Sequence, residues 1–145
     1  MNASPAAETD IPAIVALLAA SGLPSSDVLP DSHPEFLVVR DRGDVVGVVG
    51  LERFGDTALL RSLVVRPAHR GRGLGILLVR ALEQHVRDRG VSSLILLTQT
   101  AEQFFRERGY SVVARTEAPP AVQASTEFRS LCPSSAICMR KRLAT

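Results

Sequence analysis

The chain has 145 residues, 46% of them hydrophobic, and a formal net charge of +2. This length suits one domain with a single core, so we expect a single domain over residues 1–145. The hydrophobic content excludes general disorder. Arg residues are spread along the chain rather than gathered in one run, which argues against nucleic acid as the main partner.

The first apolar segment, residues 11–20, is too short to span a bilayer. It follows Glu8 and Asp10 rather than a basic stretch, which is not typical of a signal peptide. We therefore expect a cytoplasmic protein with no membrane partner.

Two cysteines, Cys132 and Cys138, could form a disulfide, bind a metal or pack in the core. No His or third Cys accompanies them, so a soft-metal site is the weaker alternative. We favour two small buried side chains and expect no metal.

The first half of the chain predicts one helix and three strands. The helix covers residues 11–21, with Asp10 as its N-cap, Pro12 in its first turn and Gly22 as its stop. A proline-containing loop over residues 22–35 follows. Strands at 36–39, 45–53 and 59–65, joined by short turns, predict an antiparallel meander.

The second half predicts an amphipathic helix over 76–87 with Glu83 on its polar face, a buried strand over 94–97 and a short helix over 101–108 capped by Thr100. Strands at 110–114 and 136–142 flank a helical turn at 125–131. A strand–helix–strand crossover places the 59–65 and 94–97 strands parallel. The fold class is therefore α/β: a mixed central sheet flanked by helices, with an antiparallel meander followed by a parallel βαβ-type crossover.

Residues 69–75, His-Arg-Gly-Arg-Gly-Leu-Gly, lie where the third strand passes into the long helix. Glycines let a ligand approach the backbone closely, and the first helical turn offers N–H groups at the positive end of the helix dipole. This corner predicts a site for a phosphate-bearing ligand. A Walker A loop is excluded because no Lys-Ser/Thr follows the glycines, and the spacing and mid-chain position do not fit a dinucleotide fold.

Residues 70–75 resemble the Arg/Gln-x-x-Gly-x-Gly/Ala motif of the GNAT superfamily of acetyl-CoA-dependent N-acetyltransferases. Residues 63–67 fit the strand that leads into this motif, and residues 101–110 resemble the family's Ala-x-x-Phe-Tyr-x-x-x-Gly-Phe segment. Residues 51–55, 60–63, 126–128 and 131–139 also look like the ArsN-type branch, which is associated with bacterial arsenic resistance.

The resemblance implies a GNAT-type fold with acetyl-CoA as co-substrate. Backbone N–H groups of the loop would bind the CoA pyrophosphate, as helix N-termini do. The strand before it would pair with pantetheine, and an aromatic side chain would pack beside it. The residues implied are Leu63, Val64, Val65, Arg70, Gly71, Arg72, Gly73, Leu74, Gly75, Ile76 and Phe104. For Arg72, a solvated surface side chain is an equal alternative.

A neutral amine is needed for attack on the thioester, so a general base is expected. Glu52 is the candidate, with a merely solvent-facing strand Glu as the alternative and Glu127 as a second candidate base. The tyrosine that often protonates the leaving thiolate in this family is replaced by Phe105, so the acid role is unassigned. Tyr110 is expected to be structural.

Arg61 is a candidate contact for an anionic acceptor, or else part of a surface salt bridge, and His33 is a candidate lining residue in the 22–35 loop. The favoured hypothesis is an N-acetyltransferase acting on the amine of a small molecule, an amino-acid-like toxicant if the ArsN-type likeness holds. A non-catalytic acyl-CoA sensor and a protein N-acetyltransferase are the alternatives. Dimers are common in the superfamily, so a homodimer is an open expectation.

Overall fold

The computed structural model describes residues 2–23, 25, 28, 34–131 and 135–143. His33 and Cys132 therefore lie outside the described residues. The chain divides into two compact units. The first contains Met1–Glu52 and Arg61–His85, and the second contains Arg53–Leu60 and Val86–Thr145.

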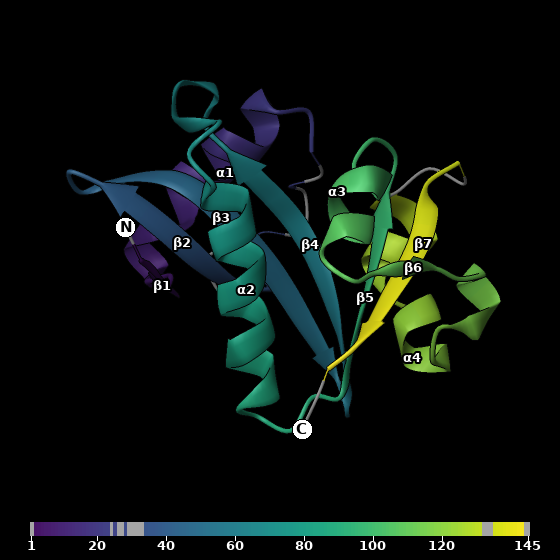
Figure 1. Cartoon of the computed structure of the whole chain (residues 1–145). Helices are drawn as coiled ribbons and strands as arrows, with labels where there is room; N and C mark the ends of the chain where they lie inside the picture. Colours follow the sequence, from purple (N-terminus) through teal and green to yellow (C-terminus); the bar gives the residue numbers. More distant parts are fainter. Residues whose placement is uncertain (1, 24, 26–27, 29–33, 132–134, 144–145) are drawn as a thin grey trace. The chain divides into compact units, whose positions relative to one another are not determined.

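Seven strands form one mixed sheet in the order β1-β2-β3-β4-β5-β7-β6 (Figure 1). Strand β4 pairs with β5 in parallel, whereas β1–β2, β2–β3, β5–β7 and β6–β7 are antiparallel. This arrangement confirms the predicted mixed sheet and its parallel crossover. The strands are β1 Ala3–Pro5, β2 Glu35–Asp41, β3 Asp44–Phe54, β4 Thr57–Val65, β5 Ser93–Thr98, β6 Ser111–Val112 and β7 Ile137–Arg142.

The helices of the described residues differ in length and kind. The α-helices are α1 Ile11–Ala20, α2 Leu74–Arg87, α3 Glu102–Glu107 and α4 Pro120–Gln123. Short 3-10 turns cover Glu8–Asp10, Pro67–His69 and Arg115–Glu117, and a π-helical turn covers Glu127–Leu131. Strand β1 and helix α4 are too short to show a periodic pattern, and they were not predicted.

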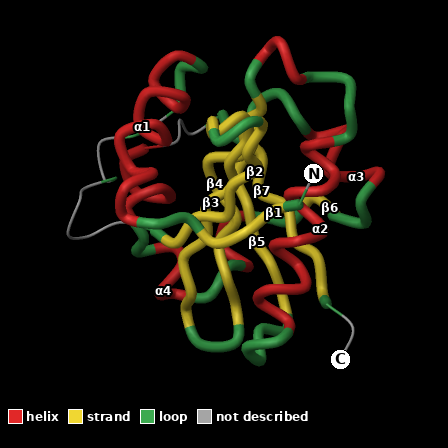
Figure 2. The backbone as a smooth tube through the Cα atoms, turned by 90° about the vertical axis from the view of Figure 1, so that its left-hand side faces the viewer, coloured by secondary structure: helices red, strands yellow, loops and turns green. Residues whose placement is uncertain are grey.

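Within the first unit, α1 and α2 lie on opposite faces of strands β2 and β3 (Figures 1 and 2). Side chains point alternately to the two faces of a strand, so one face of each strand can pack against α1 and the other against α2. Phe36, Val38 and Val48 join α1 in one apolar cluster. On the other face Gly47 lies under α2, where an added Cβ would meet Leu78 Cδ1 at 3.1 Å. This glycine therefore marks a close approach between strand and helix.

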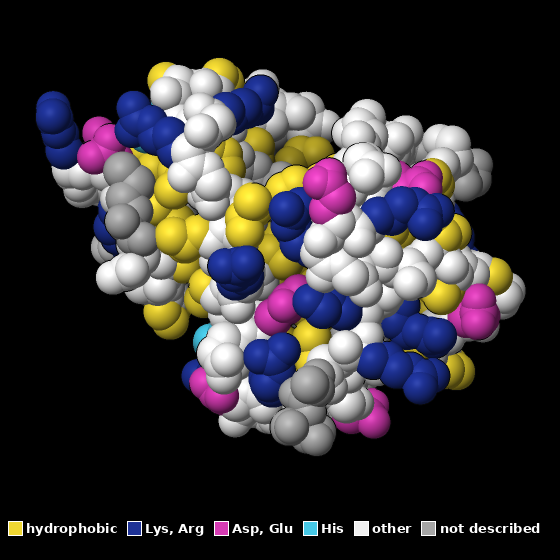
Figure 3. Space-filling model, in the orientation of Figure 1, with side chains coloured by type: hydrophobic (Ala, Val, Ile, Leu, Met, Phe, Trp, Pro, Cys, Tyr) yellow, Lys and Arg dark blue, Asp and Glu magenta, His cyan; other side chains and the backbone are white. Residues whose placement is uncertain are grey.

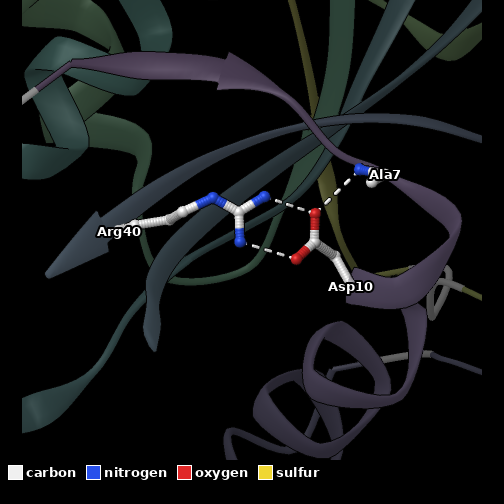
Figure 4. Close-up of polar contacts among 3 residues, drawn as sticks. All are labelled: Ala7, Asp10 and Arg40. Carbon is white, nitrogen blue, oxygen red and sulfur yellow. Dashed lines mark hydrogen bonds and ion pairs between the residues drawn. The ribbon is translucent and has the colours of Figure 1, made fainter. Parts of the chain in front are cut away.

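The predicted N-cap role of Asp10 is wrong. Its side chain makes no cap hydrogen bond to α1. It instead accepts from Arg40 Nη1 at 2.7 Å and Arg40 Nη2 at 2.5 Å, and from the Ala7 backbone N–H at 2.7 Å (Figure 4). A bidentate guanidinium is a stronger partner for a carboxylate than a helix N–H. Because Arg40 donates to it, the pKa of Asp10 lies below its usual value.

Three further expectations need correction. Helix α2 begins at Leu74, two residues before the predicted start, because Gly75 is tolerated in a first turn. Glu83, expected on its polar face, is buried. Thr100 does not cap α3: the N-cap is Ala101, which has no side-chain cap bond, and its N–H donates to Thr98 Oγ1 at 3.0 Å.

In the second unit, β5 is buried along its centre and packs in a cluster with Val122, Phe128 and Cys138. Burial raises the pKa of the Cys138 thiol. Tyr110 is buried with its ring 5.3 Å from that of Phe105, which fits its expected structural role.

Two surface features bear on the expected partners. Among the described residues, none of the helices combines the length and the apolar character needed to cross a bilayer. On the face drawn in Figure 3, Lys and Arg side chains lie in several separate places, with Asp and Glu among them.

Candidate active site

Residues 70–73, in the loop between β4 and α2, are exposed. Gly71 and Gly73 have φ angles of 80° and 76°, which favour glycine, and a Cβ built on either would meet nothing within 4 Å. Both residues are exposed. The loop therefore has open space beside its backbone, as binding of a bulky ligand group requires.

Helix α2 directly follows this loop, so its N-terminus faces the same region of the chain. The Leu77 N–H donates to the Gly73 carbonyl at 3.0 Å, which closes the first turn. The N–H groups of Leu74, Gly75 and Ile76 consequently have no partner within the helix. With 14 residues, α2 is long enough for its dipole to favour an anion at this end.

The side chains in and beside the loop range from exposed to buried. Arg70 is exposed, and its Nε donates to the Val65 carbonyl at 3.1 Å, at the end of β4. Arg72 is exposed as well. Leu74 is buried and ties the start of α2 to the core. Of the strand residues before the loop, Val64 packs in the cluster around α1, and Leu63 and Val65 are half-buried.

Strands β3 and β4 bring together two of the predicted site residues, Glu52 and Arg61. Arg61 Nη1 lies 3.1 Å from Glu52 Oε1. The Arg61 side chain has no exposed area, whereas that of Glu52 is 25% exposed. Glu52 is therefore the member of the pair that a ligand could reach, and the pair is not the surface salt bridge that was one expectation for Arg61.

An irregular position in β4 orients Arg61. The next residue, Ser62, has a φ of 58°, a left-handed conformation that is uncommon for a residue with a side chain. Arg61 Nε donates to Ser62 Oγ at 3.1 Å. Gly50, on β3, leaves room for this arrangement, because an added Cβ there would lie 3.3 Å from Arg61 Cγ. Sequence reasoning missed Ser62, since serine gives no local signal for a left-handed strand residue.

The remaining predicted residues belong to the second unit. Phe104 is half-buried, with its ring 5.1 Å from that of Phe105 and Arg108 Cζ 4.5 Å above its centroid. Phe105 is buried. Glu127 is buried at the start of the π-helical turn, a kind of helix often found at functional sites.

No group of three or more His, Cys, Asp or Glu residues is arranged to hold a metal ion within the part of the chain that the structure describes. The first unit contains instead the backbone N–H groups at the start of α2, which suit an anionic ligand, and the partly exposed Glu52 carboxylate, which suits proton transfer.

Comparison with protein families matches residues 14–112, more than half of the chain, to the acetyltransferase (GNAT) family. This range contains β4, the loop of residues 70–73 (the glycine loop), α2 and Phe104. A search of curated proteins gives no match.

Solved structures share the fold along the whole chain. N-acetylglutamate synthase from Neisseria gonorrhoeae, crystallised with coenzyme A and N-acetyl-glutamate, is 25% identical with a TM-score of 0.84, over 100% of this chain and 36% of that one. The chain thus spans about a third of that synthase. A putative acyl-CoA N-acyltransferase from Klebsiella pneumoniae is 25% identical with a TM-score of 0.70, over 99% of this chain and 97% of that one.

Rv2747 from Mycobacterium tuberculosis, solved in complex with CoA, is similar in fold and in length. It is 24% identical with a TM-score of 0.85, over 99% of this chain and 100% of that one. At this level of identity the likeness concerns the fold alone.

Proposed function

The chain belongs to the acetyltransferase (GNAT) family, and on this basis we propose that it moves the acetyl group of acetyl-CoA to the amine of a small, amino-acid-like molecule. The observation that carries the proposal is the exposed loop at the start of α2. Its open backbone and unpaired helical N–H groups suit the pyrophosphate of CoA. The bound N-acetyl-glutamate of the N. gonorrhoeae synthase supports an amino acid as the acceptor class.

In the proposed reaction, the amine nitrogen attacks the thioester carbonyl carbon, the C–S bond breaks, and CoA leaves as the thiolate. The amine loses one proton, and the thiolate gains one from solvent. Because a thiol has a pKa of about 8.5, the thiolate leaves without a dedicated acid. This fits the presence of the buried, non-ionisable Phe105 at the position of the family's tyrosine.

Glu52 is the proposed general base, acting directly or through a water molecule. Its carboxylate is partly exposed on β3, so it can accept a proton from an incoming amine. Arg61 is proposed to position this carboxylate rather than to bind the acceptor, because its guanidinium is buried and already donates to Glu52 and Ser62. Glu127 stays the second candidate base.

The test is a free-thiol release assay with acetyl-CoA and a panel of amino acids, their toxic analogues and simple amines. The likeness to the ArsN-type branch is the reason for including the analogues. We expect turnover with at least one amino-acid-like acceptor. Tight CoA binding without turnover on any acceptor would favour the sensor alternative, and turnover with peptides alone would favour a protein N-acetyltransferase.

A cytoplasmic location and a homodimer are part of the same proposal. The family resemblance is the basis for the dimer. Light scattering of the purified protein at several concentrations measures its mass directly, and a value of 15.6 kDa, that of one chain, would contradict the dimer.

A further inference from the structure

His69 lies in the 3-10 turn Pro67–His69, one residue before the glycine loop begins. Its Nε2 is 3.0 Å from Asp41 Oδ2, on a residue 28 positions earlier in the chain. The two side chains are 17% and 31% exposed, so solvent screens the contact only in part. The entry of the loop is therefore held by a long-range polar contact to another strand.

The direction of this hydrogen bond follows from the chemistry of the two groups. An ionised carboxylate only accepts, so Nε2 of His69 carries the hydrogen. Its other ring nitrogen, Nδ1, is buried and has no hydrogen-bond partner among the described residues. Among the described residues, Asp41 is therefore the hydrogen-bond partner of the His69 ring, and this bond fixes the orientation of the ring.

Asp41 is a firm anchor because of its place in the hairpin. It is the last residue of β2 and pairs with Asp44 across a two-residue turn. Arg42 and Gly43 in this turn have φ angles of 53° and 86°, the signs expected for the type I′ turn that matches strand twist. The carboxylate is consequently presented from the turn end of the β2–β3 hairpin, just after a shift in strand register between Val39 and Arg40.

The loop after His69 needs such an anchor more than most loops do. Glycines have the largest backbone freedom, and a loop that is ordered only when ligand binds loses affinity to that ordering. One other long-range bond holds the end of β4, where the Arg66 N–H donates to the Val46 carbonyl at 2.8 Å. The remaining contacts at the entry are local in sequence: the His69 N–H to Arg66 carbonyl bond at 2.9 Å, the Arg70 N–H to Pro67 carbonyl bond at 3.3 Å and the Arg70 Nε to Val65 carbonyl bond at 3.1 Å.

We propose that His69 and Asp41 are positioning residues for the CoA pyrophosphate: their hydrogen bond pre-orders the loop from which the backbone N–H groups bind it. The inference rests on the proposed function, since it assigns the loop to acetyl-CoA. Neither side chain is a catalytic residue, because neither takes part in the transfer of the acetyl group.

The experiment compares acetyl-CoA with acetyl-pantetheine, which carries the same thioester but lacks the pyrophosphate. His69→Ala and Asp41→Ala are each expected to raise KM for acetyl-CoA and Kd for CoA by about 3- to 10-fold, the usual effect of one hydrogen bond, with kcat changed less than about twofold. The double variant is expected to be no worse than either single variant. With acetyl-pantetheine, kcat/KM should match the wild type.

Conservative variants guard against misfolding. His69→Gln keeps a donor near the position of Nε2, and Asp41→Asn keeps an acceptor, so both should recover most of the affinity for CoA. The matched control is a second histidine–carboxylate pair among the described residues of the first unit, His85 Nε2 to Glu35 Oε1 at 3.5 Å, toward the opposite end of α2. His85→Ala should leave CoA binding unchanged.

Two results would overturn the inference alone: wild-type affinity for CoA in both alanine variants, or an equal loss with acetyl-CoA and acetyl-pantetheine. A wild-type protein without affinity for CoA would instead overturn the proposed function, and the inference with it.

Discussion

The guanidinium of Arg61 is fully buried beside the partly exposed carboxylate of Glu52, with 3.1 Å between Nη1 and Oε1. The two residues are nine positions apart, on the neighbouring strands β3 and β4. This asymmetry is the basis for the different roles that we propose for them: Glu52 as the residue that meets a ligand, and Arg61 as the residue that holds the Glu52 carboxylate in place.

Replacing Glu52 by Gln tests the proposed base. The amide keeps the shape and can still accept from Arg61, but it cannot take a proton. We expect kcat/KM to fall by about 100-fold or more, with a changed acidic limb of the pH–rate profile. Glu127→Gln serves as the comparison. An unchanged profile in Glu52→Gln together with a large loss in Glu127→Gln would transfer the role to Glu127.

Replacing Arg61 by Gln should harm both folding and activity. The variant leaves the Glu52 carboxylate without its buried partner and removes the bond to Ser62. Because Glu52 is partly exposed, we expect a loss of about 1–3 kcal/mol in the free energy of unfolding, below the range for a fully buried pair. Urea denaturation measures this loss. If Arg61 instead contacts an anionic acceptor, KM for that acceptor will rise far more than kcat falls.

Replacing Gly71 by Ala tests the left-handed loop. A side chain at φ 80° is strained by about 1–2 kcal/mol, which disfavours the loop conformation that we propose binds CoA. We expect KM for acetyl-CoA to rise about 5- to 20-fold. Gly90→Ala, at φ 84° just beyond the other end of α2, carries the same strain without contacting the loop. It should lower stability but leave KM unchanged, and an equal effect of both on KM would contradict the assignment.

Replacing Asp10 by Asn should make stability less dependent on pH. The Arg40 guanidinium lowers the pKa of Asp10 in the folded state, so the pair stabilises the protein fully above the unfolded pKa, about 3.9, and this contribution is lost as pH falls through the lower folded value. We expect the variant to lose about 1–2 kcal/mol at pH 7, since Arg40 is 37% exposed, and the difference from wild type to shrink below about pH 4.

Denaturant titrations of both proteins at pH 7, 5, 4 and 3 measure this trend. Arg40→Gln is the partner variant, and the double variant should lose little beyond either single one. A difference that stays constant down to pH 3 would show that Asp10 acts through its shape rather than its charge.

Much of the architecture could be predicted because local patterns are strong in this chain. Helix α2 carries an apolar stripe that repeats at helical spacing, and β5 is a continuous apolar run between polar ends. The loop before α2 was predicted from its glycines, and Gly71 and Gly73 have the positive φ angles that favour this residue. Asp10 was assigned the wrong role because the prediction used local patterns alone. Its position before the helix is typical of a cap, but Arg40, 30 residues away, is a stronger partner for its carboxylate.

The sequence by itself thus determined the order and kind of the main elements, the glycine-rich loop before α2 and the family. Only the tertiary structure decided which charged residues meet: Glu52 with Arg61, Asp10 with Arg40 and Asp41 with His69. Helix and strand periods are set by neighbouring residues, whereas these pairs depend on strand order, register and one left-handed residue in β4. Such contacts form only once the sheet has brought distant segments side by side.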